Sequence, residues 1–171
     1  MNTYLSIGLA VVALLSIVPF LLPASQTVER SAVVAAPADK LYALIASNEG
    51  FQTFNPYKLQ DANLKVELYG PQSGVGSGFA FESKDGKGTS TIVAVEENKR
   101  VQMALDLGPM GKPITTFTLT PSDAQTRVTW STTSHFGNNP IGRVVGLFLD
   151  KILGGTYEMG LQQLAKVSTA R

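Results

Sequence analysis

The chain has 171 residues, with 14 basic and 13 acidic side chains and a formal net charge of +1 at pH 7. This balance provides no extended basic surface, so we expect no nucleic-acid partner. The sequence holds no cysteine, which excludes disulfides, thiolate metal sites and a catalytic thiol. Its single histidine excludes a histidine-rich metal centre, and we expect neither a metal nor a cofactor.

An apolar run covers residues 5–22 without a charged residue. As a helix it would be about 27 Å long, close to the hydrocarbon thickness of a bilayer. Residues 1–4 carry no Lys or Arg and no small-x-small site follows, which favours an uncleaved anchor over a cleaved signal peptide. We therefore expect a single-pass membrane anchor and linker over 1–25 and one domain over 26–171, with the side of the membrane left open.

The domain begins with a strand and two short helical segments. Residues 27–34 have the β-branched content of a strand. Apolar residues recur at helical spacing over 38–46, which predicts a short amphipathic helix. Residues 51–57 are expected to form a brief helical turn that stops at Pro56.

The hydrophobic period then changes from about 3.6 to 2. Short turns rich in Gly, Pro, Asn and Asp separate the apolar segments, so antiparallel hairpins are expected. The segments with this pattern are residues 64–69, 77–83, 88–96, 100–107, 114–120 and 126–136. In the last of these, Val128 and Trp130 alternate with polar residues, which predicts one dry face and one wet face.

A long C-terminal helix is expected to cover the dry face. It would start at Pro140 and run for about 28 residues, roughly 42 Å. Its apolar stripe comprises Leu149, Leu153, Tyr157, Leu161 and Leu164. Gly154 and Gly155 lie midway, where they predict either a bend or the close approach of a strand or ligand.

Several segments resemble the polyketide cyclase/dehydrase-type members of the START-like (SRPBCC, Bet v 1-like) superfamily. They are VERS at 28–31, APA at 36–38, FNPY at 54–57, GPQSGVG at 70–76 and TRVTWS at 126–131. The resemblance covers about residues 27–168 and implies an α+β helix-grip fold. In that fold a seven-stranded antiparallel sheet wraps around the long C-terminal helix and encloses an apolar cavity able to hold a lipophilic molecule. Phe54 and Tyr57 stand here in the family's W-N-P-W-like segment.

The candidate cavity residues are the large inward side chains and a helix glycine. They are Tyr57, Tyr69, Phe79, Phe81, Met103, Phe117, Trp130, Gly155 and Tyr157. The tyrosines combine an apolar body with a hydroxyl that could orient a ligand. No catalytic residue is assigned, because His135 has no carboxylate in its own strand and no acidic pair stands out. The glycines at 74–78 lead into a strand and not a helix, which disfavours a phosphate-binding loop.

These observations favour a non-catalytic, membrane-tethered module that binds a hydrophobic small molecule or lipid. Two alternatives stay open. One is a cyclase or dehydratase of polyketide type in which a Tyr or Arg143 supplies the acid or stabilises charge. The other is an interaction protein whose cavity is filled by its own side chains, which predicts a cavity too small for any ligand.

Overall fold

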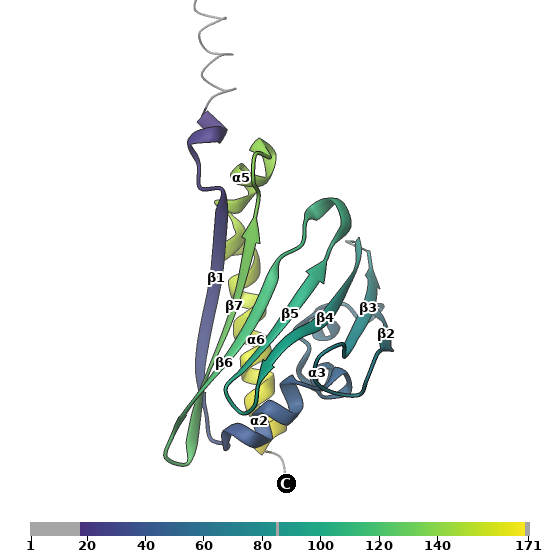
Figure 1. Cartoon of the computed structure of the whole chain (residues 1–171), viewed down its shortest axis with the longest axis vertical. Helices are drawn as coiled ribbons and strands as arrows, with labels where there is room; N and C mark the ends of the chain where they lie inside the picture. The colour runs from purple at the N-terminus through teal and green to yellow at the C-terminus, as the bar shows by residue number, and fades with distance from the viewer. Residues whose placement is uncertain (1–17, 85, 170–171) are drawn as a thin grey trace, which may run out of the picture.

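The computed structural model describes residues 18–84 and 86–169. Within these ranges seven strands form one antiparallel sheet in the order β1-β7-β6-β5-β4-β3-β2 (Figure 1). The strands are β1 (Ser25–Val34), β2 (Lys65–Tyr69), β3 (Gly78–Ser83), β4 (Gly86–Glu96), β5 (Arg100–Asp106), β6 (Ile114–Ser122) and β7 (Gln125–His135). This arrangement, with a long C-terminal helix beside the sheet, confirms the expected α+β helix-grip fold.

The two faces of the sheet differ in polarity. The face that packs against the helices is called the inner face. It carries the buried side chains of Val128, Trp130, Phe117 and Val101. The outer face is the opposite one. Strict alternation in β5, β6 and β7 places these residues together, as the period-2 pattern predicts. In β4 the register shifts between Ile92 and Ala94, so an extra residue interrupts the alternation as a β-bulge.

Short helices close one end of the inner face. They are α2 (Ala38–Ile45), α3 (Asn48–Phe54) and α4 (Pro56–Gln60), and η1 (Gly108–Met110) lies in the β5–β6 loop. The predicted brief turn over 51–57 is thus two helices that meet at Asn55. The Asn55 side chain accepts a hydrogen bond from the backbone of Tyr57, so it caps α4, and Pro56 occupies the first helical position.

The expected single C-terminal helix is divided into α5 (Pro140–Gly146) and α6 (Leu149–Thr169). At the junction the amides of Leu147 and Phe148 donate to the carbonyls three residues earlier instead of four, which tightens the turn. Asn139 caps α5 by accepting from the amides of two α5 residues. The division therefore precedes Gly154, and α6 runs unbroken through both glycines.

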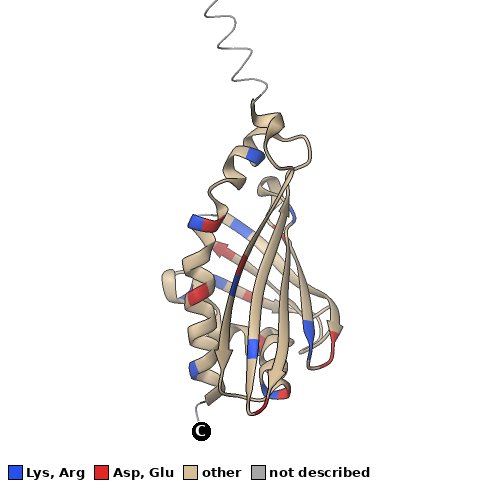
Figure 2. Ribbon diagram, turned by 90° about the vertical axis from the view of Figure 1, so that its left-hand side faces the viewer, with Lys and Arg blue, Asp and Glu red and all other residues tan. Residues whose placement is uncertain are grey.

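The long helix α6 lies beside the sheet (Figure 2) and packs mainly along β1, with further contacts to α3 and α4. It therefore covers one side of the inner face more fully than the other.

Between residues 18 and 84 and between 86 and 169, no helix combines the length and the apolar content needed to cross a membrane. Most of the anchor expected over 1–25 (residues 1–17) lies outside the described residues, so the anchor stays a prediction.

Candidate functional site

An aromatic cluster fills the inner face beneath α6. The ring of Tyr157, from α6, stacks on Trp130 with centroids 4.6 Å apart and planes 9° apart. The ring of Phe117 is tilted against Trp130, with centroids also 4.6 Å apart. Phe51 and Phe54 reach the same cluster from α3. Such contacts between rings stabilise a fold beyond the area that they bury, so this half of the inner face is a packed core.

Three buried hydroxyls form a chain at the edge of this cluster. The phenol of Tyr157 donates to Thr132 Oγ1 at 2.7 Å. Thr132 Oγ1 in turn lies 2.7 Å from Thr115 Oγ1 on the neighbouring strand. Burial raises the pKa of the Tyr157 phenol, so it stays protonated at neutral pH. The chain satisfies polar groups that the core would otherwise leave unpaired.

Tyr57 brings a second phenol near the first. It lies in α4, and 40% of its surface is exposed. Desolvation raises the pKa of its phenol, and the neighbouring Tyr157 phenol adds to the shift. Both phenols are therefore neutral at physiological pH and able to donate a hydrogen bond, although the Tyr157 proton is already bonded to Thr132.

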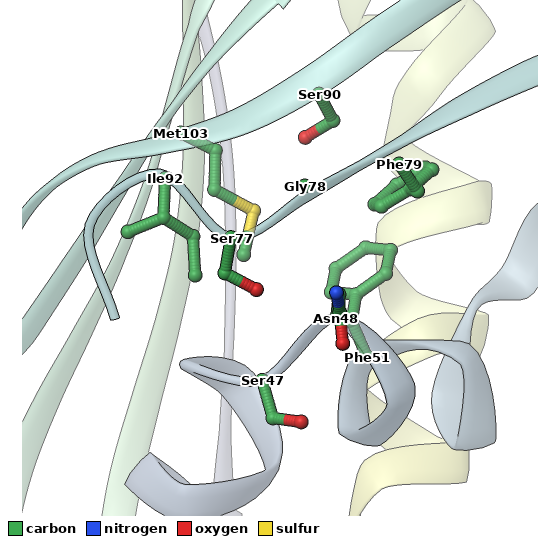
Figure 3. A pocket seen from close by; sticks show the side chains of 9 residues that line it. All are labelled: Ser47, Asn48, Phe51, Ser77, Gly78, Phe79, Ser90, Ile92 and Met103. Atoms are coloured by element: carbon green, nitrogen blue, oxygen red, sulfur yellow. The ribbon is translucent and has the colours of Figure 1, made fainter. Parts of the chain in front are cut away.

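A small pocket lies where α3 meets β3, β4 and β5 (Figure 3). Its volume is about 10 Å³, no more than one water molecule needs. It is lined by Ser47, Asn48, Phe51, Ser77, Gly78, Phe79, Ser90, Ile92 and Met103. A drug-sized ligand needs about 300 Å³ or more, so this pocket is not the ligand cavity that the resemblance implies.

The inner face of β2 and β3 is apolar but incompletely covered. Register places Val66 opposite Phe81 and Leu68 opposite Phe79, all four on the inner face. Leu105 of β5 continues the same row of side chains, because Ser90 of β4 pairs with Phe79 on one side and with Leu105 on the other. Val66, Phe81 and Leu105 are half-buried, and 40% of Leu68 is exposed. We call Val66, Leu68, Phe81 and Leu105 the open apolar surface.

The outer face carries a wide hollow of a different kind. Its volume is about 570 Å³, and it is open to solvent. Glu67, Ala80, Thr89 and Asp106 lie in one row across its floor, on the face opposite Phe79. Lys112 pairs with Asp106 at 2.8 Å. Val66 and Phe81, which belong to the open apolar surface, also line this hollow, so its lining combines charged side chains with apolar ones.

Seven of the nine candidate residues from the sequence lie on the inner side of the fold or close to it. Those buried in the packed core or beside it are Phe79, Met103, Phe117, Trp130 and Tyr157. Phe81 belongs to the open apolar surface, and Tyr57 lies partly exposed in α4. The alternation pattern therefore identified the inner face correctly, while the structure divides that face into a filled half and an open half.

Two candidates need correction. Tyr69 lies on the outer face, where its hydroxyl is 2.6 Å from Thr91 Oγ1. The Tyr69 ring lies over Gly78, because a Cβ atom at Gly78 would come within 2.7 Å of the ring. Gly155 lies on the exposed side of α6 with nothing within 4 Å of where its Cβ would be. Neither residue borders an apolar cavity.

Sequence reasoning missed an ion-pair group that fixes α6 to the sheet. Arg30, on the inner face of β1, donates to Asp150 through both terminal nitrogens, at 2.7 and 3.0 Å. Its Nε donates to Glu158 at 2.8 Å. A Cβ at Gly154 would lie 2.0 Å from Arg30 Nη2, so the glycine makes room for the guanidinium. The available signal was Arg30 at an inward position between Val28 and Ala32.

Comparison with known proteins supports this fold. A truncated norcoclaurine synthase from Thalictrum flavum is 17% identical, with a TM-score of 0.66 over 86% of this chain and 95% of that one. The same plant enzyme in complex with dopamine and hydroxybenzaldehyde is 18% identical, with a TM-score of 0.66 over 88% of this chain and 90% of that one. A protein from Chromobacterium violaceum is 14% identical, with a TM-score of 0.63 over 85% and 99%.

No characterised protein of similar sequence was found. The family described as "Polyketide cyclase / dehydrase and lipid transport" matches residues 25–169, which is most of the chain and all seven described strands. The chain therefore belongs to this family.

Proposed function

We propose that this protein is a membrane-tethered module that binds a hydrophobic small molecule or lipid on the open apolar surface. The observation that carries the proposal is the exposure of Leu68 beside half-buried Val66 and Phe81 on the inner face. Contact with a ligand would remove this apolar surface from water, worth about 25 cal/mol for each Å² buried. The family description, which includes lipid transport, points the same way.

The ligand would lie between the open apolar surface and the first turns of α6. Leu149 and Leu153 in those turns are also only half-buried. The packed aromatic core leaves a pocket of only about 10 Å³. Binding therefore needs either a ligand that stays on the open side or a small displacement of α6 from the sheet. Either way, the filled half of the inner face supplies stability while the open half supplies the contacts.

Two observations separate binding from the rival enzymatic function. A cyclase or dehydratase would need an acid beside the ligand, and Tyr57 and Tyr157, whose phenols lie close enough to interact, are the tyrosine candidates. An ordinary phenol is neutral at pH 7, and desolvation raises the pKa of both tyrosines further, but the Tyr157 proton is committed to Thr132. His135 lies exposed at the end of β7, away from the aromatic cluster. A non-catalytic role is thus our proposal.

A second candidate is an interaction protein whose grip is filled by its own side chains. The pocket of about 10 Å³ favours it, because that function requires no ligand chamber. In that case the open apolar surface would contact the apolar side chains of a protein partner. The two candidates differ in whether a small hydrophobic molecule binds to the isolated chain.

Binding of 1-anilinonaphthalene-8-sulfonate to the purified full chain tests this difference. Leu68→Asp puts a charge on the open apolar surface and should weaken probe binding at least tenfold. Val33→Asp is the matched control, because Val33 also lies on an edge strand with 51% of its surface exposed, but on the outer face. Equal probe binding by both variants would contradict the proposed site. A lipophilic adduct retained in native mass spectrometry would identify the ligand class.

The tether is tested separately. We propose that residues 5–22 stay in the mature protein and span the bilayer once. The intact mass of protein from its native membrane should then include residues 1–25, and the chain should resist extraction by alkaline carbonate. A mature form that starts near Ser25 or Gln26 would contradict the tether without affecting the binding site.

A further inference from the structure

The helix α5 and the start of α6 expose an unusual amount of apolar surface. Ile141 is 74% exposed, Phe148 55% and Ile152 58%. Val144, Val145 and Leu147 are exposed as well. We call these six residues the α5 stripe. Isolated exposed apolar residues are common on proteins, but a contiguous group marks a contact with another surface.

The α5 stripe has the spacing of one helix face. Within α5, residues 141, 144 and 145 have the i, i+3, i+4 spacing of one helix face. Phe148 and Ile152 have i, i+4 spacing where α6 begins, and the Ile152 amide donates to the Phe148 carbonyl. A water-soluble helix turns such a face toward the core, whereas this one turns it outward. The opposite face is held against the fold, since Cβ atoms at Gly142 and Gly146 would come within 3.0 and 2.6 Å of the Phe136 ring. The helix therefore cannot rotate to bury the stripe without losing this packing.

Arg143 ties α5 to the end of the apolar N-terminal run. Its Nη1 donates to the carbonyls of Phe20 and Leu22 at 2.6 and 3.1 Å. Its Nε and Nη2 donate to the carbonyl of Gly137 at 2.9 and 2.7 Å. The α5 stripe thus lies at the same end of the molecule as the described N-terminal residues (Figure 1), where Phe20 and Leu21 are also exposed.

We propose that the α5 stripe docks on the bilayer surface, with its side chains at the boundary between headgroups and acyl chains. The inference rests on the proposed membrane tether, because the run over 5–22 ends at the carbonyls that Arg143 holds. Charge agrees with this occupant: Arg143 is the one charged residue of α5. The one acidic residue between 141 and 152 is Asp150, and its carboxylate is paired with Arg30. Interfacial helices combine such an apolar face with basic residues.

Docking would fix the orientation of the domain relative to the membrane. Two attachments, the tether and the α5 stripe, restrict rotation where a tether alone would not. The linker between the tether and the domain is short, because Leu22 is only three residues from the start of β1. The sheet and α6 would then be held beside the bilayer, into which lipophilic molecules partition.

Single-cysteine spin labels test the docking, because the natural chain contains no cysteine. The full chain would be reconstituted in vesicles of phosphatidylcholine and phosphatidylglycerol. Labels at Phe148→Cys and Ile152→Cys should collide more with oxygen, which is enriched in lipid, than with a water-soluble nickel chelate. Labels at Gln162→Cys, exposed further along α6, and at Val33→Cys on the outer face should show the reverse.

Three results would overturn the proposal. If the labels at 148 and 152 collide with the nickel chelate as often as the label at 162, the α5 stripe lies in water. Labels shielded from both reagents would indicate a protein contact. Spin–spin broadening that disappears on dilution with unlabelled chain would indicate a second copy.

Carbonate extraction of the same samples separates the docking from the tether. If the chain resists carbonate extraction but its labels are exposed to water, the docking proposal is wrong and the tether stands. If carbonate releases the chain from the vesicles, the tether is absent and both proposals are wrong. Phe148→Glu provides a further check, because it should release the label at 152 into water and leave probe binding at the open apolar surface unchanged.

Discussion

The two halves of the inner face are built from similar residues but are covered differently. Beneath α6, the rings of Trp130, Phe117 and Tyr157 are buried and stacked. On β2 and β3, Leu68 and Phe81 remain partly exposed because α6 packs mainly along β1, at the other edge of the sheet. The same strand pattern therefore yields a core in one half and an available surface in the other.

This difference separates stability from binding. Substitutions in the filled half should lower the free energy of unfolding, and substitutions in the open half should chiefly change the affinity for a hydrophobic ligand. Variants of the filled half should therefore show the largest losses of stability.

Leu161→Asp should prevent the domain from folding. Leu161 is buried on the side of α6 that faces the sheet, so a carboxylate there would lose its hydration without gaining a partner. Gln162→Asp is the matched control on the exposed side of the same helix turn and should change stability by less than about 0.5 kcal/mol. Circular dichroism during denaturant titration measures both. A cooperative transition of normal midpoint for Leu161→Asp would contradict the filled half as the source of stability.

Trp130→Ala should destabilise the domain by about 3–5 kcal/mol, since it removes a large buried ring and the stacking of Tyr157. Thr129→Ala, one residue earlier on the outer face, should cost less than about 0.5 kcal/mol. Urea titration gives the free energy of unfolding of each variant, provided that the dependence of this free energy on urea concentration has the same slope in both. The reverse order would mean that the strand register is displaced by one residue.

Periodicity predicted the inner face well because it depends on each strand alone. Phe117, Val128 and Trp130 all lie where the alternation placed them. Tyr69 was assigned wrongly because a tyrosine suits either face of a strand. What decides its position is Gly78 on the partner strand, over which its ring lies. The bulge after Ile92 likewise depends on a distant segment, because the Gly76 amide donates to the Ile92 carbonyl and the Ile92 amide donates to the Ser77 carbonyl.

The candidate site was harder to predict than the fold. Exposure of Leu68 depends on where α6 crosses the sheet, and the ion pairs of Arg30 with Asp150 and Glu158 contribute to that position. Arg30 is more than 100 positions away from both acidic residues in the sequence, so no local pattern links them. The glycine pair in α6 predicted either a bend or a close approach, and the helix shows the close approach. The structure assigns it to Arg30 at Gly154, and Gly155 plays no part in it.

The two helix glycines should therefore respond differently to alanine. Gly155→Ala meets no atom within 4 Å and should stabilise the domain by about 0.5–1 kcal/mol through helix propensity, with probe binding unchanged. Gly154→Ala should give no such gain, because its methyl group displaces the Arg30 guanidinium and weakens the bonds to Asp150. Thermal unfolding of the two variants measures this difference. Equal stabilisation would mean that Arg30 does not hold α6 at this point.

The smallest effect concerns pH. The Arg30 guanidinium, which donates to both oxygens of Asp150, lowers the pKa of that carboxyl below its ordinary value. A carboxyl with a lower pKa in the folded than in the unfolded state stabilises the fold above the unfolded pKa. That contribution is lost as the pH falls through the folded pKa. The Asp150 carboxylate is exposed and Arg30 is partly exposed, so screening by solvent keeps the contribution to stability small.

Arg30→Gln should raise the pKa of Asp150 toward its ordinary value, and Arg30→Lys should raise it less, because lysine keeps the charge but not the paired geometry. Carboxyl carbon shifts of Asp150 followed by NMR through the acid range give all three values. An Asp150 titration that is identical in the wild-type chain and in Arg30→Gln would show that the pair does not form in solution. The coverage of the inner face by α6 would then have to rest on the aromatic cluster alone.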